Sequence, residues 1–137
     1  MSVSLDGRVA LITGAGSGIG RSHAVLMAER GADLIVNDLN SDGLAETAEC
    51  AATSGGKVIQ VVHDVSDVAG MARKTQAAEA EFGKIDILVN NAGISGERLA
   101  FEDVTEHAYD RMVDINLKGS FFLTQAVVPG MKKRRYG

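Results

Sequence analysis

Short apolar runs alternate with longer stretches of mixed polar and apolar residues along the chain. The runs lie at 8–13 (RVALIT), 34–36, 58–62 and 85–89, and Val, Ile and Leu dominate them. Before each of the last three runs the mixed stretch ends in glycine, in "AERGADLIV", "TSGGKVIQVV" and "EFGKIDILV". Glycine commonly follows a helix because it adopts the left-handed cap conformation without strain. The pattern therefore predicts four strands that alternate with helices.

The apolar runs are almost continuous, which is typical of strands that are buried on both faces. Strands of this kind occur in parallel sheets that are covered by helices on both sides. The predicted order is β-α-β-α-β-α-β, followed by one more long helix. This is the beginning of a doubly wound α/β fold.

Apolar side chains also predict which faces of the helices are buried. After the glycines at 14–20, a stripe of Ile19, His23, Leu26 and Met27 predicts the buried face of the first helix, with His23 as a packed histidine. The last helix has one stripe facing the sheet, formed by Tyr109, Met112, Val113, Asn116, Ser120 and Leu123. Further apolar residues lie on its other flanks, and they predict contact with a partner helix: Ile115, Leu117, Phe121 and Phe122.

Residues 13–20 read "TGAGSGIG" and contain four glycines between the first predicted strand and the first predicted helix. A tight turn would explain one or two of these glycines. A loop whose backbone approaches the phosphates of a ligand explains all four, because the N–H groups at the start of the following helix attract anions. The spacing does not fit a Walker loop, since no Gly-Lys-Ser/Thr follows. We therefore expect the pyrophosphate of a dinucleotide to bind here.

Asp38 ends the second predicted strand, 18 residues after Gly20. A carboxylate at this place can accept hydrogen bonds from both ribose hydroxyls of the adenosine. The alternative role is a helix cap or turn, for which "NDLNSDG" offers several candidates. Asp38 would repel a 2′-phosphate, and neither Ser17 nor Leu39 offers a positive charge to offset that repulsion. The sequence thus favours NAD over NADP.

Composition narrows the classes of protein and partner. The chain has 137 residues, enough for one domain, and a formal charge of −4 with a pI near 5.3, which argues against nucleic acid as a partner. The basic run at 132–135 (KKRR) is expected to be a solvated helix end. A single cysteine, Cys50, excludes an internal disulfide. No segment has the length or composition of a membrane span or signal peptide, so the cytoplasm is the expected location.

Four motifs in order give the sequence a family resemblance. The first motif is TGxxxGxG, formed by Thr13, Gly14, Gly18 and Gly20, and the second is "NNAG" at 90–93. The third is the pair Asp64 and Val65 at the end of the third strand, and the fourth is Asn116 in "DINLKGSFF". In these motifs the chain resembles the classical branch of the short-chain dehydrogenase/reductase family over nearly its whole length. The resemblance implies a Rossmann-type fold, with residues 1–137 as an NAD-binding domain.

The resemblance also implies roles for individual residues. It implies no bound metal. The positions that it implies to contact the cofactor are Gly14, Ser17, Gly18, Ile19, Gly20, Asp38, Leu39, Asp64, Val65, Asn91, Ala92 and Gly93. It implies a catalytic role for Asn116, which would hold a water in a proton relay. From the residues alone, an asparagine in an apolar stripe is more simply a structural residue with satisfied hydrogen bonds.

Part of the family's chemistry has no counterpart in this sequence. The resemblance implies a serine on a fifth strand and a Tyr-x-x-x-Lys on the next helix, but Val113 follows Tyr109 at that spacing and Tyr136 is the penultimate residue. The fold is therefore expected to be truncated after the fourth strand and the long helix. We expect the N-terminal half of an NAD-dependent oxidoreductase that interconverts a secondary alcohol and a ketone, with homo-oligomers formed through the last helix. A non-catalytic dinucleotide-binding module and an assembly element are the alternatives.

Overall fold

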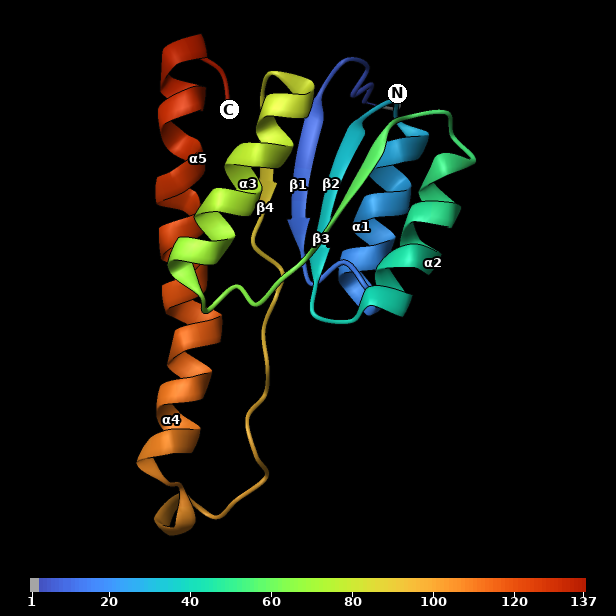
Figure 1. The fold of residues 1–137 in the computed structure, drawn as a ribbon. Helices are drawn as coiled ribbons and strands as arrows, with labels where there is room; N and C mark the ends of the chain where they lie inside the picture. Colours follow the sequence, from blue (N-terminus) through green and yellow to red (C-terminus); the bar gives the residue numbers. More distant parts are fainter. Residues whose placement is uncertain (1–2) are drawn as a thin grey trace.

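The computed structural model describes residues 3–137 and contains a sheet of four parallel strands (Figure 1). The strands are β1 (Val9–Thr13), β2 (Asp33–Asp38), β3 (Val58–Val62) and β4 (Ile87–Val89), and their order in the sheet is β3-β2-β1-β4. All three pairings are parallel. The doubly wound α/β fold predicted from the sequence is confirmed.

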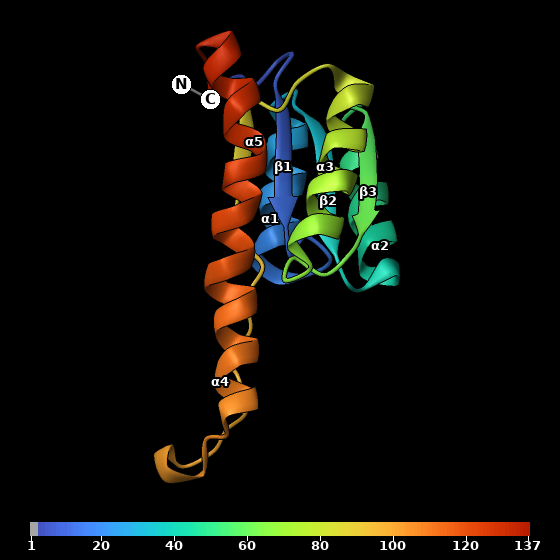
Figure 2. The same ribbon diagram turned by 60° about the vertical axis from the view of Figure 1, so that its left-hand side comes forward.

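Helices cover both faces of the sheet (Figure 2). On one side lie α1 (Gly18–Glu29) and α2 (Ser41–Ala52), and on the other lie α3 (Val68–Phe82) and α5 (Ser120–Arg134). Before α5 come a 3₁₀ turn (Phe101–Asp103), α4 (Glu106–Val113) and a π-helical segment (Asp114–Gly119). Within residues 3–137, no helix combines the length and the hydropathy that crossing a bilayer requires.

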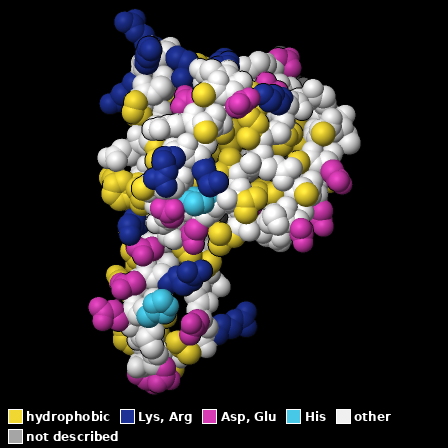
Figure 3. All heavy atoms as spheres, viewed as in Figure 1, with side chains coloured by type: hydrophobic (Ala, Val, Ile, Leu, Met, Phe, Trp, Pro, Cys, Tyr) yellow, Lys and Arg dark blue, Asp and Glu magenta, His cyan; other side chains and the backbone are white. Residues whose placement is uncertain are grey.

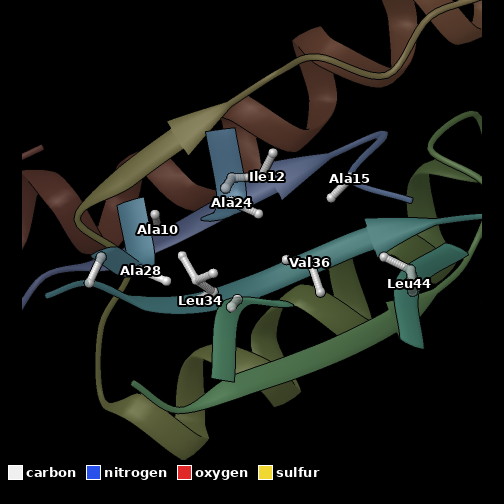
Figure 4. Close-up of a cluster of buried hydrophobic side chains, with 10 residues drawn as sticks. Ala10, Ile12, Ala15, Ala24, Ala28, Leu34, Val36 and Leu44 are labelled. Carbon is white, nitrogen blue, oxygen red and sulfur yellow. The ribbon is translucent and has the colours of Figure 1, made fainter. Parts of the chain in front are cut away.

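The sheet separates two hydrophobic cores. Side chains alternate along β1 and β2, so Ala10, Ile12, Leu34 and Val36 face α1 and α2 (Figure 4). Val9, Leu11 and Ile35 face α3 and α5 on the other side. All five residues of β1 are buried, as expected for a strand that has partners on both edges and helices on both faces.

The prediction for the buried face of α1 is wrong in part. His23 and Met27 are partly buried, and Met27 packs against the core as predicted. Ile19 and Leu26 are exposed, and the buried residues are Gly20, Ala24 and Ala28. Small residues face the sheet because α1 runs very close to it: a Cβ on Gly20 would overlap the carbonyl oxygen of Gly14. Ile19 and Leu26 are consequently left on the outer side of the helix.

The prediction for the stripe of the last helix is also wrong in part. The buried positions are Ile115, Gly119, Leu123 and Val127, whereas Tyr109 is 57% exposed and Asn116 is exposed. Asp114–Gly119 is π-helical, with hydrogen bonds spanning five residues, so the face of the helix shifts at this segment relative to a regular α-helix. Ile115, predicted on a flank, therefore points into the core.

The segment from Asn90 to Val113 extends away from the sheet (Figures 1 and 2). None of the residues of α4 is buried. α5 packs along α3, and its last turn carries Lys132, Lys133 and Arg134. Dark blue side chains gather at the upper end of this helix in Figure 3.

Candidate functional site

The carboxyl ends of the four strands meet at one edge of the sheet. β1 continues there into the glycine loop, β2 ends at Asp38, and β4 continues into Asn90 and Asn91. β1 connects to the helices on one face and β4 to the helices on the other, so the strand order reverses between these two strands. In open α/β sheets, ligands bind in the crevice at such a reversal.

The glycine loop presents free backbone N–H groups. α1 begins at Gly18, and its N-cap Ser17 is extended and makes no capping hydrogen bond through its side chain. The first turn contains no acidic residue that would compete for an anion. Gly18 has a φ of 52°, which side chains rarely adopt, and a Cβ there would face open space. The N–H groups of this turn can therefore receive a phosphate at close range.

Asp38 faces the glycine loop from the end of β2. Its Oδ2 accepts a hydrogen bond from the Gly16 N–H at 2.9 Å, and its Oδ1 accepts one from the Asn40 N–H at 3.0 Å. A carboxylate has about four acceptor positions, so roughly two remain for a ligand. The cap of α2 is provided by Asn40, which accepts from Gly43 N–H, and the alternative role of Asp38 as that cap is not needed.

Arg21, which contacts the glycine loop and α2, has partners of its own. Arg21 forms an ion pair with Glu46 at 2.8 Å and donates to Thr47 Oγ1 at 3.0 Å. Leu39, next to Asp38, is exposed and apolar. Among the described residues, the Asp38 carboxylate itself forms no ion pair, and its hydrogen bonds come from backbone N–H groups.

Asn91 fastens the end of β4 to the glycine loop. Its Nδ2 donates to the carbonyl oxygens of Thr13 and Gly14, at 2.9 and 3.1 Å. Thr13 Oγ1 in turn accepts from the backbone N–H groups of Asn91 and Ala92, at 3.1 and 3.0 Å. Asn91, predicted to contact the cofactor, uses its side-chain amide to position the loop.

Asp64 and Val65 follow β3. Asp64 Oδ1 accepts from the backbone N–H and the hydroxyl of Ser66, at 2.8 and 2.7 Å, while Val65 is buried. The cap of α3 is Asp67, which accepts from Gly70 N–H and lies 2.8 Å from His63 Nε2. These two hydrogen bonds hold the pKa of the Asp67 carboxyl below its usual value.

A hollow of about 150 Å³ lies between these strand ends. Six of the predicted site residues line it, namely Gly14, Asp38, Leu39, Val65, Ala92 and Gly93. Sequence reasoning did not place five others at the site that also line it: Asn37, His63, Ile94, Arg111 and Ile115. Asn37 could have been noticed as the first polar residue at the end of an apolar strand. Arg111 lies on a helix whose position relative to the sheet no local pattern defines.

Asn116 pairs with the backbone of the loop that follows β4. Its Oδ1 accepts from Ile94 N–H and its Nδ2 donates to the Ile94 carbonyl oxygen, both at 2.8 Å. The side chain thus ties the π-helical segment to the loop, which is the satisfied structural role inferred from the residues alone. Among residues 3–137, no group of three or more His, Cys, Asp or Glu side chains is arranged to hold a metal ion.

Comparison with known proteins matches this site to a family. The profile of the family described as "short chain dehydrogenase" matches residues 8–137. The chain belongs to this family. Peroxisomal multifunctional enzyme type 2 of Drosophila melanogaster is 43% identical, over 96% of this chain and 23% of its own length. The 3-oxoacyl-(acyl-carrier-protein) reductase of Thermotoga maritima is 40% identical, over 97% of this chain and 54% of its own length.

Solved structures of the family show the same fold. An NAD+-bound xylitol dehydrogenase is 32% identical with a TM-score of 0.92, over 96% of this chain and 51% of that chain. A metagenomic short-chain oxidoreductase in complex with NADP is 28% identical with a TM-score of 0.92, over 97% of this chain and 60% of that chain. This chain thus spans about half the length of most of these relatives, and oxidoreductases of its family bind a nicotinamide dinucleotide.

Proposed function

We propose that this chain is the cofactor-binding part of an NAD-dependent oxidoreductase that interconverts a secondary alcohol and a ketone. A bound nicotinamide dinucleotide would supply the site of hydride transfer. The chain's own residues would bind and orient it: the first turn of α1 the pyrophosphate, Asp38 the adenosine ribose, and Val65, Ala92 and Gly93 the walls of the crevice. The names of the relatives, a 3-oxoacyl reductase and a xylitol dehydrogenase among them, support a hydroxyl or carbonyl substrate.

One observation carries the choice of NAD. The Asp38 carboxylate, fixed by Gly16 and Asn40, lies at the mouth of the hollow without an ion pair among the described residues. Two ribose hydroxyls would donate to it, whereas a 2′-phosphate would be repelled. Neighbours in the family include both NAD and NADP complexes, so cofactor choice rests on Asp38 and its surroundings.

Calorimetric titration with both cofactors tests this choice. A hydrogen bond to a charged group contributes about 1.5–3 kcal/mol, so NAD should bind at least about tenfold more tightly than NADP. Asp38→Ala should narrow the gap, mainly by weakening NAD binding. Asp42→Ala, which removes an exposed carboxylate from the first turn of α2, serves as the control and should leave the gap unchanged. Equal affinities for the two cofactors in the unmodified chain would contradict the assignment.

This chain is expected to bind NAD without turning over a substrate. The sequence has no Tyr-x-x-x-Lys, and loss of general acid–base catalysis alone costs about 10²–10⁴ in rate. We therefore expect NAD binding with no measurable turnover of alcohols or ketones by the 137-residue chain. NADH absorbance with a broad panel of substrates, on protein of verified mass, is the measurement. Robust turnover would show that the catalytic groups lie elsewhere than the resemblance implies.

We also propose a cytoplasmic location and a homo-oligomer formed through the last helix. The oligomer is inferred from the apolar residues that α5 and its π-helical start leave exposed, namely Leu117, Phe121 and Phe122. A non-catalytic dinucleotide-binding module remains the second candidate function, because the glycine loop and Asp38 suffice for binding. An extended chain that includes a Tyr-x-x-x-Lys and turns over substrate would exclude it.

A further inference from the structure

The outer edge of β3 is open to another strand. Among the described residues β3 pairs with β2 alone, and Figure 2 shows it at the border of the sheet. The Lys57 carbonyl oxygen accepts from Leu34 N–H at 2.8 Å, and His63 N–H donates to the Asp38 carbonyl oxygen at 3.1 Å. Backbone groups alternate in direction along a strand, so every second residue from 57 to 63 faces β2. The residues between them turn their N–H and C=O groups outward, and these are Val58, Gln60 and Val62.

This edge lacks the features that usually keep edge strands from pairing. Such strands commonly carry charged residues, proline or a bulge. β3 reads Val-Ile-Gln-Val-Val, and its register with β2 runs through five consecutive pairs without a bulge. Val62 is 44% exposed, and Gln60 is exposed as well. An apolar and regular edge of this kind favours the addition of a further strand.

A groove of about 560 Å³ lies beside this edge, between β3 and α3. Ile59 and Val61 form its apolar floor, and α3 forms its wall. Three residues of that wall are exposed and recur along one side of the helix, namely Lys74, Ala77 and Glu81. Lys74 and Glu81 are two turns apart, about 10 Å along the helix axis, with the small Ala77 between them. The rim of the groove therefore carries a positive charge toward one end and a negative charge toward the other.

The direction of α3 relative to β3 fixes which charge lies at which end of the strand. Glu81 forms an ion pair at 3.4 Å with Lys57, which directly precedes β3. Lys74 lies two turns earlier in α3 and hence nearer the end of β3. Within residues 3–137 Lys74 forms no ion pair. Reversing the direction of this edge thus exchanges the positions of the two charges.

A second copy of the chain, turned by a two-fold axis through Gln60, matches this edge. In antiparallel pairing the two Gln60 residues exchange hydrogen bonds with each other, and Val58 exchanges them with Val62 of the partner. On the face covered by α3, Ile59 lies opposite the partner's Val61. Apolar pairs of this kind stabilise a sheet, and the pairing sets no like charges of the strand directly opposite each other.

We propose that two copies of this chain associate through their β3 edges, antiparallel and two-fold symmetric, which joins their four-stranded sheets into one. The rotation that pairs the strands also brings Lys74 opposite the partner's Glu81, so the rims of the two grooves are complementary in charge. A surface that complements its own reversed copy is what a two-fold interface requires. The contact lies at the opposite edge of the sheet from β4, so it is independent of association through the last helix.

The test measures association by analytical ultracentrifugation in a chain that already carries Phe121→Glu, which removes the contact expected of the last helix. We expect a dimer with a Kd of about 100 μM, as for a small transient interface. Gln60→Lys would set two like charges opposite each other at the two-fold axis and should weaken the dimer at least about fivefold. Gln76→Lys is the control, because it is the same substitution at an exposed position of α3 that does not line the groove; it should leave the Kd unchanged.

Charge reversal tests the two-fold arrangement itself. Lys74→Glu or Glu81→Lys alone would create two like-charge contacts in the dimer, and each should weaken it about threefold. The double variant recreates both opposite-charge contacts and has the same net charge as its parent. Its Kd should therefore return to within about twofold of the parent's value.

A Phe121→Glu chain that stays monomeric at about 500 μM overturns the proposal. A dimer that Gln60→Lys and Gln76→Lys affect equally also overturns it, and so does one that the double charge reversal fails to restore. If Gln60→Lys does not fold, the charge-reversal variants still decide, because Lys74 and Glu81 are both exposed.

Discussion

The crevice side of the molecule and its long terminal helix differ in how completely their apolar side chains are buried. Around β1 and β2, small residues bring α1 close to the sheet, and Thr13 and Asn91 join the loop to β4 through four hydrogen bonds. Along α4 and α5, by contrast, Tyr109, Leu117 and Phe121 are exposed. The first region is closed around a concave polar crevice, which suits a small ligand. The second exposes apolar side chains along a helix, which suits contact with another protein.

A substitution at Gly20, where α1 lies against the glycine loop, is expected to have the largest effect on stability and NAD binding. Gly20→Ala would place a Cβ against the Gly14 carbonyl and the Asn91 amide, so we expect a loss of about 3 kcal/mol in stability together with loss of NAD binding. Urea denaturation measures the loss of stability, and calorimetry measures NAD binding. Wild-type stability in this variant would mean that α1 does not lie as close to the loop as described.

Gly18→Ala is the matched variant, because its Cβ meets no other atom. It imposes a left-handed conformation on alanine, which costs about 1–2 kcal/mol. Its effect on NAD binding should nevertheless be as large as that of Gly20→Ala, since the new methyl group lies where the phosphates approach. Undiminished NAD affinity in Gly18→Ala would place the phosphates elsewhere.

Much of this organisation was predictable from the sequence, and the failures have physical causes. Continuous apolar runs marked β1 and β2 closely, because strands buried on both faces need apolar residues at nearly every position. The run at 58–62 marked β3 as well, although β3 is an edge strand that is only partly buried. The face of α1 was mispredicted because close packing selects Gly20 and Ala24 over larger residues. The π-helical segment at Asp114–Gly119 shifts the helical face and leaves no mark in the hydrophobic period.

The residues in and around the crevice divide in the same way. Asp38 and the glycine loop were predictable because a motif fixes both their types and their spacing. Asn37 and Arg111 were not, because they reach the hollow only through pairing of β2 with β3 and through the placement of the terminal helix. Asn116 was predictable as a residue of interest, but its pairing with Ile94 depends on a loop of irregular backbone.

The exposed apolar surface of the terminal helix provides the next test. Leu117 and Phe121 are 65% and 62% exposed and line a groove beside Asn90, at the free edge of the sheet next to β4. We expect the chain to self-associate at about tens of micromolar, where weak contacts become populated. Phe121→Glu should shift light-scattering mass toward the monomer.

Phe101→Glu is the control for this variant, because Phe101 is 92% exposed but lies in the 3₁₀ turn, outside the groove. It should leave the association unchanged. A monomeric wild-type chain, or equal effects of the two substitutions, would contradict an association surface on the helix.

The smallest effect concerns the caps of α2 and α3, two helices that begin at the crevice edge on opposite faces of the sheet. Asn40 and Asp67 each accept a hydrogen bond from a glycine N–H three residues on, Gly43 and Gly70, but only Asp67 titrates. Hydrogen bonds from Gly70 and His63 hold the pKa of Asp67 below its usual 3.8. A carboxyl with a lowered folded-state pKa stabilises the fold above its unfolded pKa, and this contribution is lost as the pH falls through the folded value.

The stability difference between wild type and Asp67→Ala should therefore be constant near neutral pH and shrink below about pH 4. Asn40→Ala should instead lower stability by the same amount at every pH, and urea denaturation between pH 3 and 7 would distinguish the two. A difference for Asp67→Ala that persists undiminished in acid would show that its cap works without the carboxylate charge.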